Sequence, residues 1–147
     1  MARASPASLA RAAPTTSSLG VLNLVAGNNT LAPGDYYYSV INISAIGSTL
    51  STTGGVVRIW FDSLNYSGSG ATIGTGPPGN LWLMGTCGAV AQFSGITTTI
   101  SAIIYNPSGT VNFSGNNTTV YGAIVASSIN LSANNVSIHR DFATCGY

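Results

Sequence analysis

A five-residue pattern of apolar and polar positions recurs along most of the chain. In its clearest copies, residues 111–115 and 129–133, an apolar residue, Asn, an apolar residue, Ser and a small residue follow one another. Apolar residues at the first and third positions alternate with a polar one, as in a half-buried β-strand. Six copies begin at residues 22, 41, 64, 91, 111 and 129, so the spacing between copies runs from 18 to 27 residues.

The agreement between copies extends to a second pair of positions. Eight residues after each start lies a hydroxyl residue, namely Thr30, Thr49, Thr72, Thr99, Thr119 and Ser137. An aliphatic residue follows each of them, which predicts a second short strand with its hydroxyl side chains outward. A third apolar segment, such as residues 36–40 or 56–61, follows in each of the first five copies. Three short strands in a repeat of about 20 residues predict a parallel β-helix.

We therefore expect residues 21–147 to form one all-β domain, a short parallel β-helix (β-solenoid) of about six three-strand rungs, each rung being one turn of the solenoid. One interior column should hold the third residue of every copy: Leu24, Ile43, Tyr66, Phe93, Phe113 and Leu131. The Gly- and Pro-rich residues 74–79 are expected to form a turn outside the ladder. Residues 1–20, rich in Ala, Ser and Pro, are expected to be an extended arm or linker, which a neighbouring subunit could hold.

Charged residues make up only 5% of the chain and the net charge is +1, with no Lys or Glu. Nucleic-acid binding needs clustered cations, so we expect no nucleic-acid partner. No run of 18 apolar residues occurs, so no transmembrane segment is expected. Cys87 and Cys145, with the single His139, are too few ligands for a zinc site, and neither a metal nor a cofactor is expected.

The two cysteines allow two interpretations. Cys87 and Cys145 either form one disulfide of an exported protein or are two unrelated buried thiols. Low charge and many Asn-x-Ser/Thr triplets favour an extracellular or cell-surface location and hence the disulfide.

The residue types that catalyse hydrolysis are scarce. His139, Arg140 and Asp141 are adjacent, and neighbouring strand residues point to opposite faces, so they cannot converge as a catalytic triad. Glycoside hydrolysis needs two facing carboxylates, and only Asp35, Asp62 and Asp141 are present. We therefore expect no enzymatic activity, and interpret residues 139–141 as a polar cap on the last rung.

Two polar columns are candidate binding rows. The second position of each copy holds Asn23, Asn42, Asn65, Gln92, Asn112 and Asn130. Stacked amides that hydrogen-bond along the solenoid are the favoured interpretation, although the same residues form possible glycan acceptors. The outward Thr column could bind ice or carbohydrate, but its neighbouring positions are irregular, so a simple hydroxyl ladder is favoured.

Aromatic residues gather on the third strands of the first three rungs. They are Tyr36, Tyr37, Tyr38, Trp60, Phe61 and Trp82. Alternation should bury some of them, and the outward ones would form an exposed patch that contacts a partner or a sugar.

Four segments resemble a known family in order and spacing. Residues 120–132 (VYGAIVASSINLS), 31–38 (LAPGDYYY), 103–107 (IIYNP) and 138–141 (IHRD) are similar to motifs of a β-helical repeat domain. That domain lies at the C-terminus of bacterial exported, pilus-assembly-type proteins. The resemblance covers about residues 21–142 and implies a β-helix without an established enzymatic activity; a looser resemblance is to the polymeric bactofilins.

Two functional hypotheses follow. The first is a structural, self-assembling surface protein, because each end of a β-helix exposes an unpaired strand edge and few charges oppose association. A homo-oligomer or polymer, with the N-terminal arm adding to a neighbour, is then the expected partner. The alternative is a carbohydrate- or surface-binding module that uses the aromatic patch.

Overall fold

The computed structural model describes residues 17–25 and 27–140. The described residues hold no α-helix, and their only helical element is a single 3-10 turn. The elements are β1 (Val21–Leu24), β2 (Asn28–Leu31), β3 (Gly34–Ile43), β4 (Thr49–Thr52), β5 (Val57–Tyr66), β6 (Thr72–Ile73), η2 (Pro78–Asn80), β7 (Leu81–Phe93), β8 (Thr98–Phe113), β9 (Thr118–Leu131) and β10 (Val136–His139).

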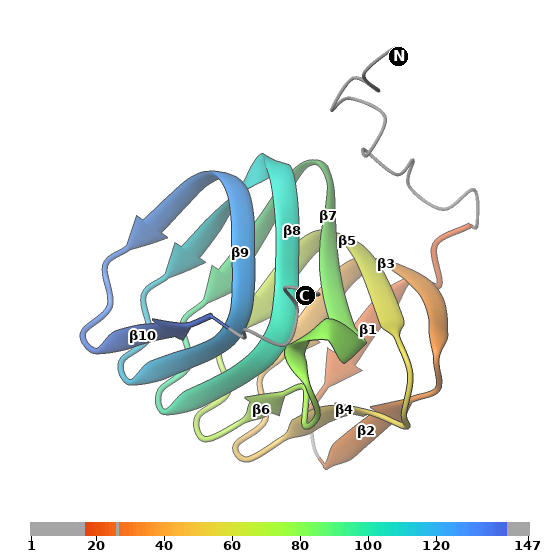
Figure 1. Ribbon diagram of the computed structural model, residues 1–147, viewed down its shortest axis with the longest axis horizontal. Coiled ribbons are helices and arrows are strands. Elements are labelled where there is room, and N and C mark those ends of the chain that lie inside the picture. Colours follow the sequence, from red (N-terminus) through yellow and green to blue (C-terminus); the bar gives the residue numbers. More distant parts are fainter. Residues whose placement is uncertain (1–16, 26, 141–147) are drawn as a thin grey trace, which may run out of the picture.

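All pairings between these strands are parallel. The chain winds so that one series of strands runs β1, β3, β5, β7, β8, β9, and the other runs β2, β4, β6, β8, β9, β10. Figure 1 shows the resulting stack, with β1 and β2 at one end and β9 and β10 at the other. The predicted all-β parallel solenoid of about six rungs is confirmed.

The strands are longer than the three separate segments per rung that the sequence predicts. β3, β5 and β7 each combine the third strand of one rung with the first strand of the next, and β8 and β9 also include a second strand. Shifts in register mark the bends, for example between Phe61 and Ser63 and between Met84 and Val90. Bulges therefore bend the chain at these corners without ending the ladder.

The interior column predicted from the repeat is present in register. Leu24 pairs with Ile43, and the column continues through Tyr66, Phe93 and Phe113 to Leu131. All members except Leu131 are buried. The rings of Phe93 and Phe113 stack with centroids 5.0 Å apart. Aromatic stacking thus adds to apolar burial along the axis of the solenoid.

A second repeating feature is a left-handed residue at one corner. Two residues before the hydroxyl column, φ is positive at Gly47, Gly70, Thr97, Asn117 and Asn135. Gly and Asn tolerate this conformation, whereas β-branched Thr97, with φ of 56°, is strained there.

The Gly- and Pro-rich insertion forms η2 outside the ladder, as predicted. Pro78 is buried and lies against Gly122, where an added Cβ would come within 3.1 Å of the proline Cβ. The Ser101 hydroxyl donates to the Gly76 carbonyl oxygen at 2.6 Å. The insertion therefore folds back over the outside of β8 and β9.

Candidate functional site

The amide column on the outer face is a hydrogen-bonded ladder in two sections. Asn42 donates to the Oδ1 of Asn23 at 2.9 Å, and Asn65 donates to that of Asn42 at 3.2 Å. In the later section, Asn130 donates to the Oδ1 of Asn112 at 2.7 Å. Gln92 lies in register between the sections but donates to the hydroxyl of Ser114. Within each section the asparagines hydrogen-bond to one another and stabilise the stack.

The hydroxyl column needs one correction. Thr49, Thr72, Thr99, Thr119 and Ser137 are in register. Thr30 pairs instead with Ser51, with a hydroxyl–hydroxyl distance of 2.8 Å, and Asn28 occupies the position beside Thr49. Three residues separate β1 from β2, whereas five separate β3 from β4, so the first corner is two residues shorter.

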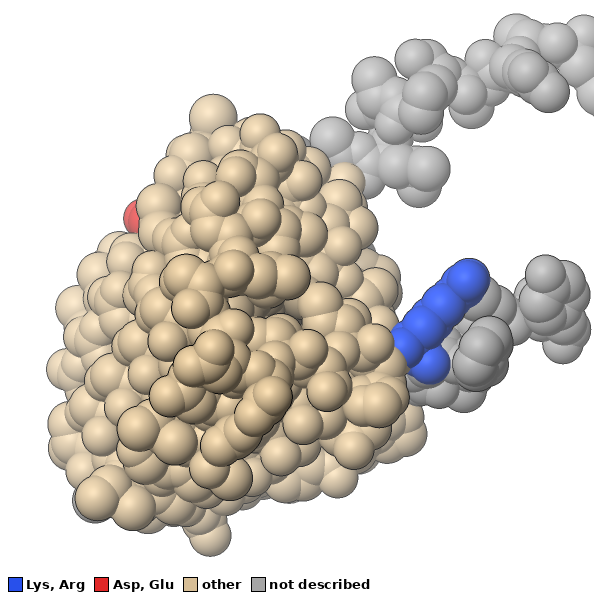
Figure 2. Space-filling view, turned by 90° about the vertical axis from the view of Figure 1, so that its left-hand side faces the viewer, with Lys and Arg blue, Asp and Glu red and all other residues tan. Residues whose placement is uncertain are grey.

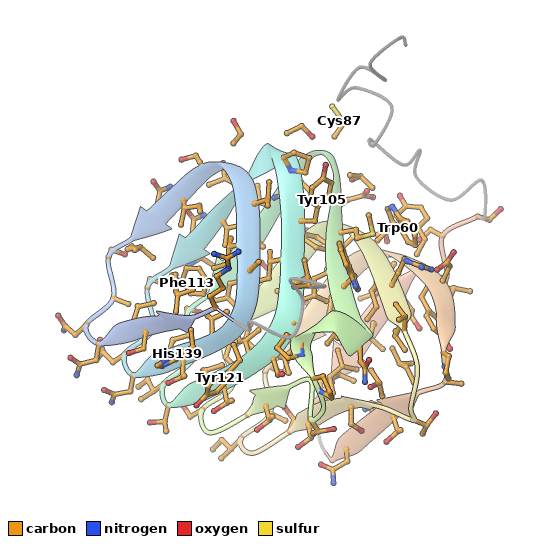
Figure 3. All side chains as sticks on the ribbon, viewed as in Figure 1. Trp60, Cys87, Tyr105, Phe113, Tyr121 and His139 are labelled. Carbon is orange, nitrogen blue, oxygen red and sulfur yellow. The ribbon has the colours of Figure 1, made fainter. Side chains whose placement is uncertain are left out.

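The predicted aromatic patch is also corrected. Phe61 points inward and is fully buried. Trp60 points outward, yet only 3% of it is exposed, because it lies in register between Tyr37 and Met84. Figure 3 shows Trp60 on this outer face, where Tyr105 follows Met84 in the column. Large neighbouring side chains on a flat sheet cover one another, which period-two alternation does not predict.

The remaining four aromatic residues are half-buried. Tyr36 and Tyr38 point inward, in register with buried Ile59 and Phe61. Tyr37 points outward and donates a hydrogen bond to the Asp62 carboxylate at 2.8 Å, and this bond raises the pKa of Tyr37. Trp82 donates from Nε1 to the Gly79 carbonyl oxygen at 3.0 Å.

Nearby, Asp35 and Arg58 form an ion pair at 2.9 Å.

The basic residues near the C-terminus lie apart from these features. His139 stacks on Tyr121, with ring centroids 5.2 Å apart, and both side chains are exposed (Figure 3). Arg140 is exposed at the edge of the last rung, and Asp141 lies outside the described residues. The polar-cap interpretation therefore stays a prediction.

Cys87 is exposed at the bend of β7, where it projects from the solenoid in Figure 3. Cys145 lies outside the described residues, so the disulfide stays a prediction. Within the described ranges, no three His, Cys, Asp or Glu side chains come together as metal ligands. The described residues also contain no helix of the length and hydropathy needed to cross a membrane.

The last rung exposes the interior of the solenoid. Its inward-facing side chains are Ile124, Ala126, Ile129, Leu131, Val136 and Ile138, which we call the C-terminal end face. Their partners in the preceding rung are buried, but Ile129 is 41% exposed, Ile138 47% and Leu131 56%. Figure 2 views the molecule from this end, and the charged side chains in view lie at its rim.

The opposite end is better packed. Its inward-facing side chains include Leu22, Leu24, Tyr36 and Tyr38, which we call the N-terminal end face. Leu24 is only 1% exposed, and the two tyrosine rings lie nearly parallel, with centroids 6.5 Å apart. The Tyr36 hydroxyl donates to the Ala32 carbonyl oxygen at 3.0 Å. Aromatic rings thus cover much of the core at this end.

One buried polar residue has no counterpart in the sequence pattern. The amide of Asn106 donates to the carbonyl oxygens of Ala89 and Thr110, at 2.9 and 3.2 Å. Its Oδ1 accepts no hydrogen bond from the described residues. Gly85 and Gly109 lie so close to this side chain that a Cβ on either would overlap it. The two glycines are the only sequence signal for this buried amide.

Residues 62–145 match a protein family described as a domain of unknown function (DUF7305). The match begins within β5, so it spans the later rungs of the solenoid. Comparisons with curated proteins and with solved structures found no match. Because the matched residues make up more than half of the chain, this protein belongs to the DUF7305 family.

Proposed function

We propose that this chain is a structural, non-catalytic protein that assembles with copies of itself at the cell surface or outside the cell. The observation that carries the proposal is the exposed C-terminal end face. A parallel solenoid ends in strands whose backbone donors and acceptors need partners, and association supplies them. Here the strand edge surrounds apolar side chains whose partners in the preceding rung are buried.

Low charge supports the same function. In the described ranges, the charged side chains are Asp35, Arg58, Asp62 and Arg140. The first three lie on β3 and β5, far from the last rung along the stack. Charged residues on an edge strand normally prevent association, and β9 contains none.

Sedimentation velocity over a range of protein concentrations tests this proposal. Self-assembly predicts species heavier than one chain, whose proportion rises with concentration. A single species with the mass of one chain at every concentration would contradict it.

The alternative function, a carbohydrate- or surface-binding module, is favoured by one observation. Tyr37, Trp82 and Tyr105 are partly exposed on the outer face of neighbouring strands, where sugar rings can stack on aromatic rings. A monomer that binds glycans, and loses binding on Trp82→Ala, would favour this alternative over assembly.

A further inference from the structure

We propose that the C-terminal end face binds the N-terminal end face of a second copy, so that chains stack head to tail. This inference rests on the proposed self-assembly and names the two surfaces that meet. In this stack the parallel solenoid continues from one copy into the next, and β1 of one copy pairs with the end of β9 of another.

Both ends of the solenoid belong to the same columns of the repeat. Leu22, Asn23 and Leu24 begin three columns that run through every rung. Ile129, Asn130 and Leu131 end the same three columns. Head-to-tail stacking therefore places aliphatic on aliphatic and amide on amide, and extends the ladder in which Asn130 already donates to Asn112.

Among the described strands, each end of the solenoid has a backbone edge that pairs on one side only. β10 pairs with residues 118–121 of β9, so among the described strands residues 122–131 pair on one side only, with β8. At the other end, β3 is the only described strand that pairs with β1. A second copy in the same orientation offers these edges the parallel ladder that joins every pair of rungs within the chain. In a contact between two C-terminal ends, the strands that meet would run antiparallel, and the amide columns of the two copies would be out of register.

The two end faces differ in shape. Leu131 and Ile129 project from one end, whereas stacked Tyr36 and Tyr38 cover the other. Two different surfaces on one chain make a heterologous contact, which gives open filaments unless the rotation between copies closes a ring. On the β2 side of the stack, the short first corner would place Ser137 of one copy on Asn28 of the next, and Ile138 on Asn29. Apolar contact between the copies is therefore concentrated on the β1 and β3 side.

Two matched substitutions in one column test this contact. Ile129→Lys places a charge on the C-terminal end face, and Leu22→Lys places one on the N-terminal end face. Val125→Lys is the control, because Val125 lies on β9 with 44% exposure but points to the outer face. Circular dichroism checks that each variant keeps its strand content; if Leu22→Lys does not, Leu22→Asn replaces it.

Sedimentation velocity of the full chains then gives distinct outcomes. Head-to-tail stacking predicts that Ile129→Lys and Leu22→Lys are each monomeric, that their equimolar mixture forms dimers of twice the chain mass, and that Val125→Lys assembles like the unmodified chain. Dimers of Leu22→Lys alone would indicate contact between two C-terminal ends and overturn the inference. Undiminished assembly of Ile129→Lys would also overturn it, while leaving self-assembly intact. A monomeric unmodified chain would overturn the proposed function itself.

Discussion

Thr97 is the residue whose replacement should stabilise the solenoid most clearly. It adopts φ of 56°, a left-handed conformation that is costly for a β-branched side chain. In the next two rungs, the same corner position is occupied by Asn117 and Asn135, whose φ values are 57° and 58°. Thr97→Asn should therefore remove about 1 kcal/mol of backbone strain, because Asn tolerates this conformation.

The substitution should also extend a side-chain ladder. Asn135 donates to the Oδ1 of Asn117 at 3.0 Å, which leaves the Asn117 amide positioned beside residue 97. An added hydrogen bond contributes about 0.5–1.5 kcal/mol. Together the two effects predict a free energy of unfolding higher by about 1.5–2.5 kcal/mol. The Tm should then be higher by roughly 4–12 °C for a domain of this size.

Thermal unfolding followed by circular dichroism measures this change. The reciprocal variant, Asn117→Thr, introduces the same strain and breaks the bond to Asn135, so its Tm should fall by a similar amount. Thr99→Asn, at an ordinary outward strand position, controls for composition and should not raise the Tm. A Thr97→Asn protein that is folded but no more stable than the unmodified chain would refute the reasoning.

Three further predictions concern packing, pH and the cysteines. Gly115→Ala should destabilise the protein by about 3 kcal/mol in chemical denaturation, because its Cβ would overlap the Gly95 carbonyl oxygen of the preceding rung. Gly76→Ala should be nearly neutral, because its Cβ would lie 3.5 Å from its nearest neighbour, the side-chain amide of Asn80. Burial raises the pKa of Tyr66 above its ordinary value of 10.0, so the stability it supports is fully present below pH 10 and is lost as pH rises further. Tyr66→Phe should therefore flatten the loss of stability above about pH 10, and an equally steep loss in the variant would count against this. Oxidised protein should carry a Cys87–Cys145 disulfide that adds about 4 kcal/mol for a loop of about 58 residues, and two free thiols in a non-reducing mass measurement would exclude it.

The sequence predicts the interior of this fold well, because each column repeats one physical requirement. Phe93 and Phe113 lie at the same position of consecutive copies, and the structure stacks their rings in register. The pattern also locates Leu131 in this column. Because Leu131 belongs to the last copy, no further rung covers it, and it is exposed.

Features that depend on a single corner or on neighbouring side chains are not predictable in this way. Thr30 leaves the hydroxyl column because a corner two residues shorter shifts the register, and a count of eight residues cannot detect that shift. Trp60 is buried although it points outward, because Tyr37 and Met84 cover it on the same face. Asn106 is buried at the bend of β8, and the residue in register with it on β9 is Ala126, so no repeated column predicts an amide there.

Electron microscopy of the purified full chain tests most directly whether this solenoid continues from one molecule into the next. Six rungs spaced by about 4.8 Å predict unbranched filaments one solenoid wide, with an axial repeat of about 29 Å. Particles of single-chain size at every concentration, or filaments without this axial repeat, would contradict end-to-end stacking.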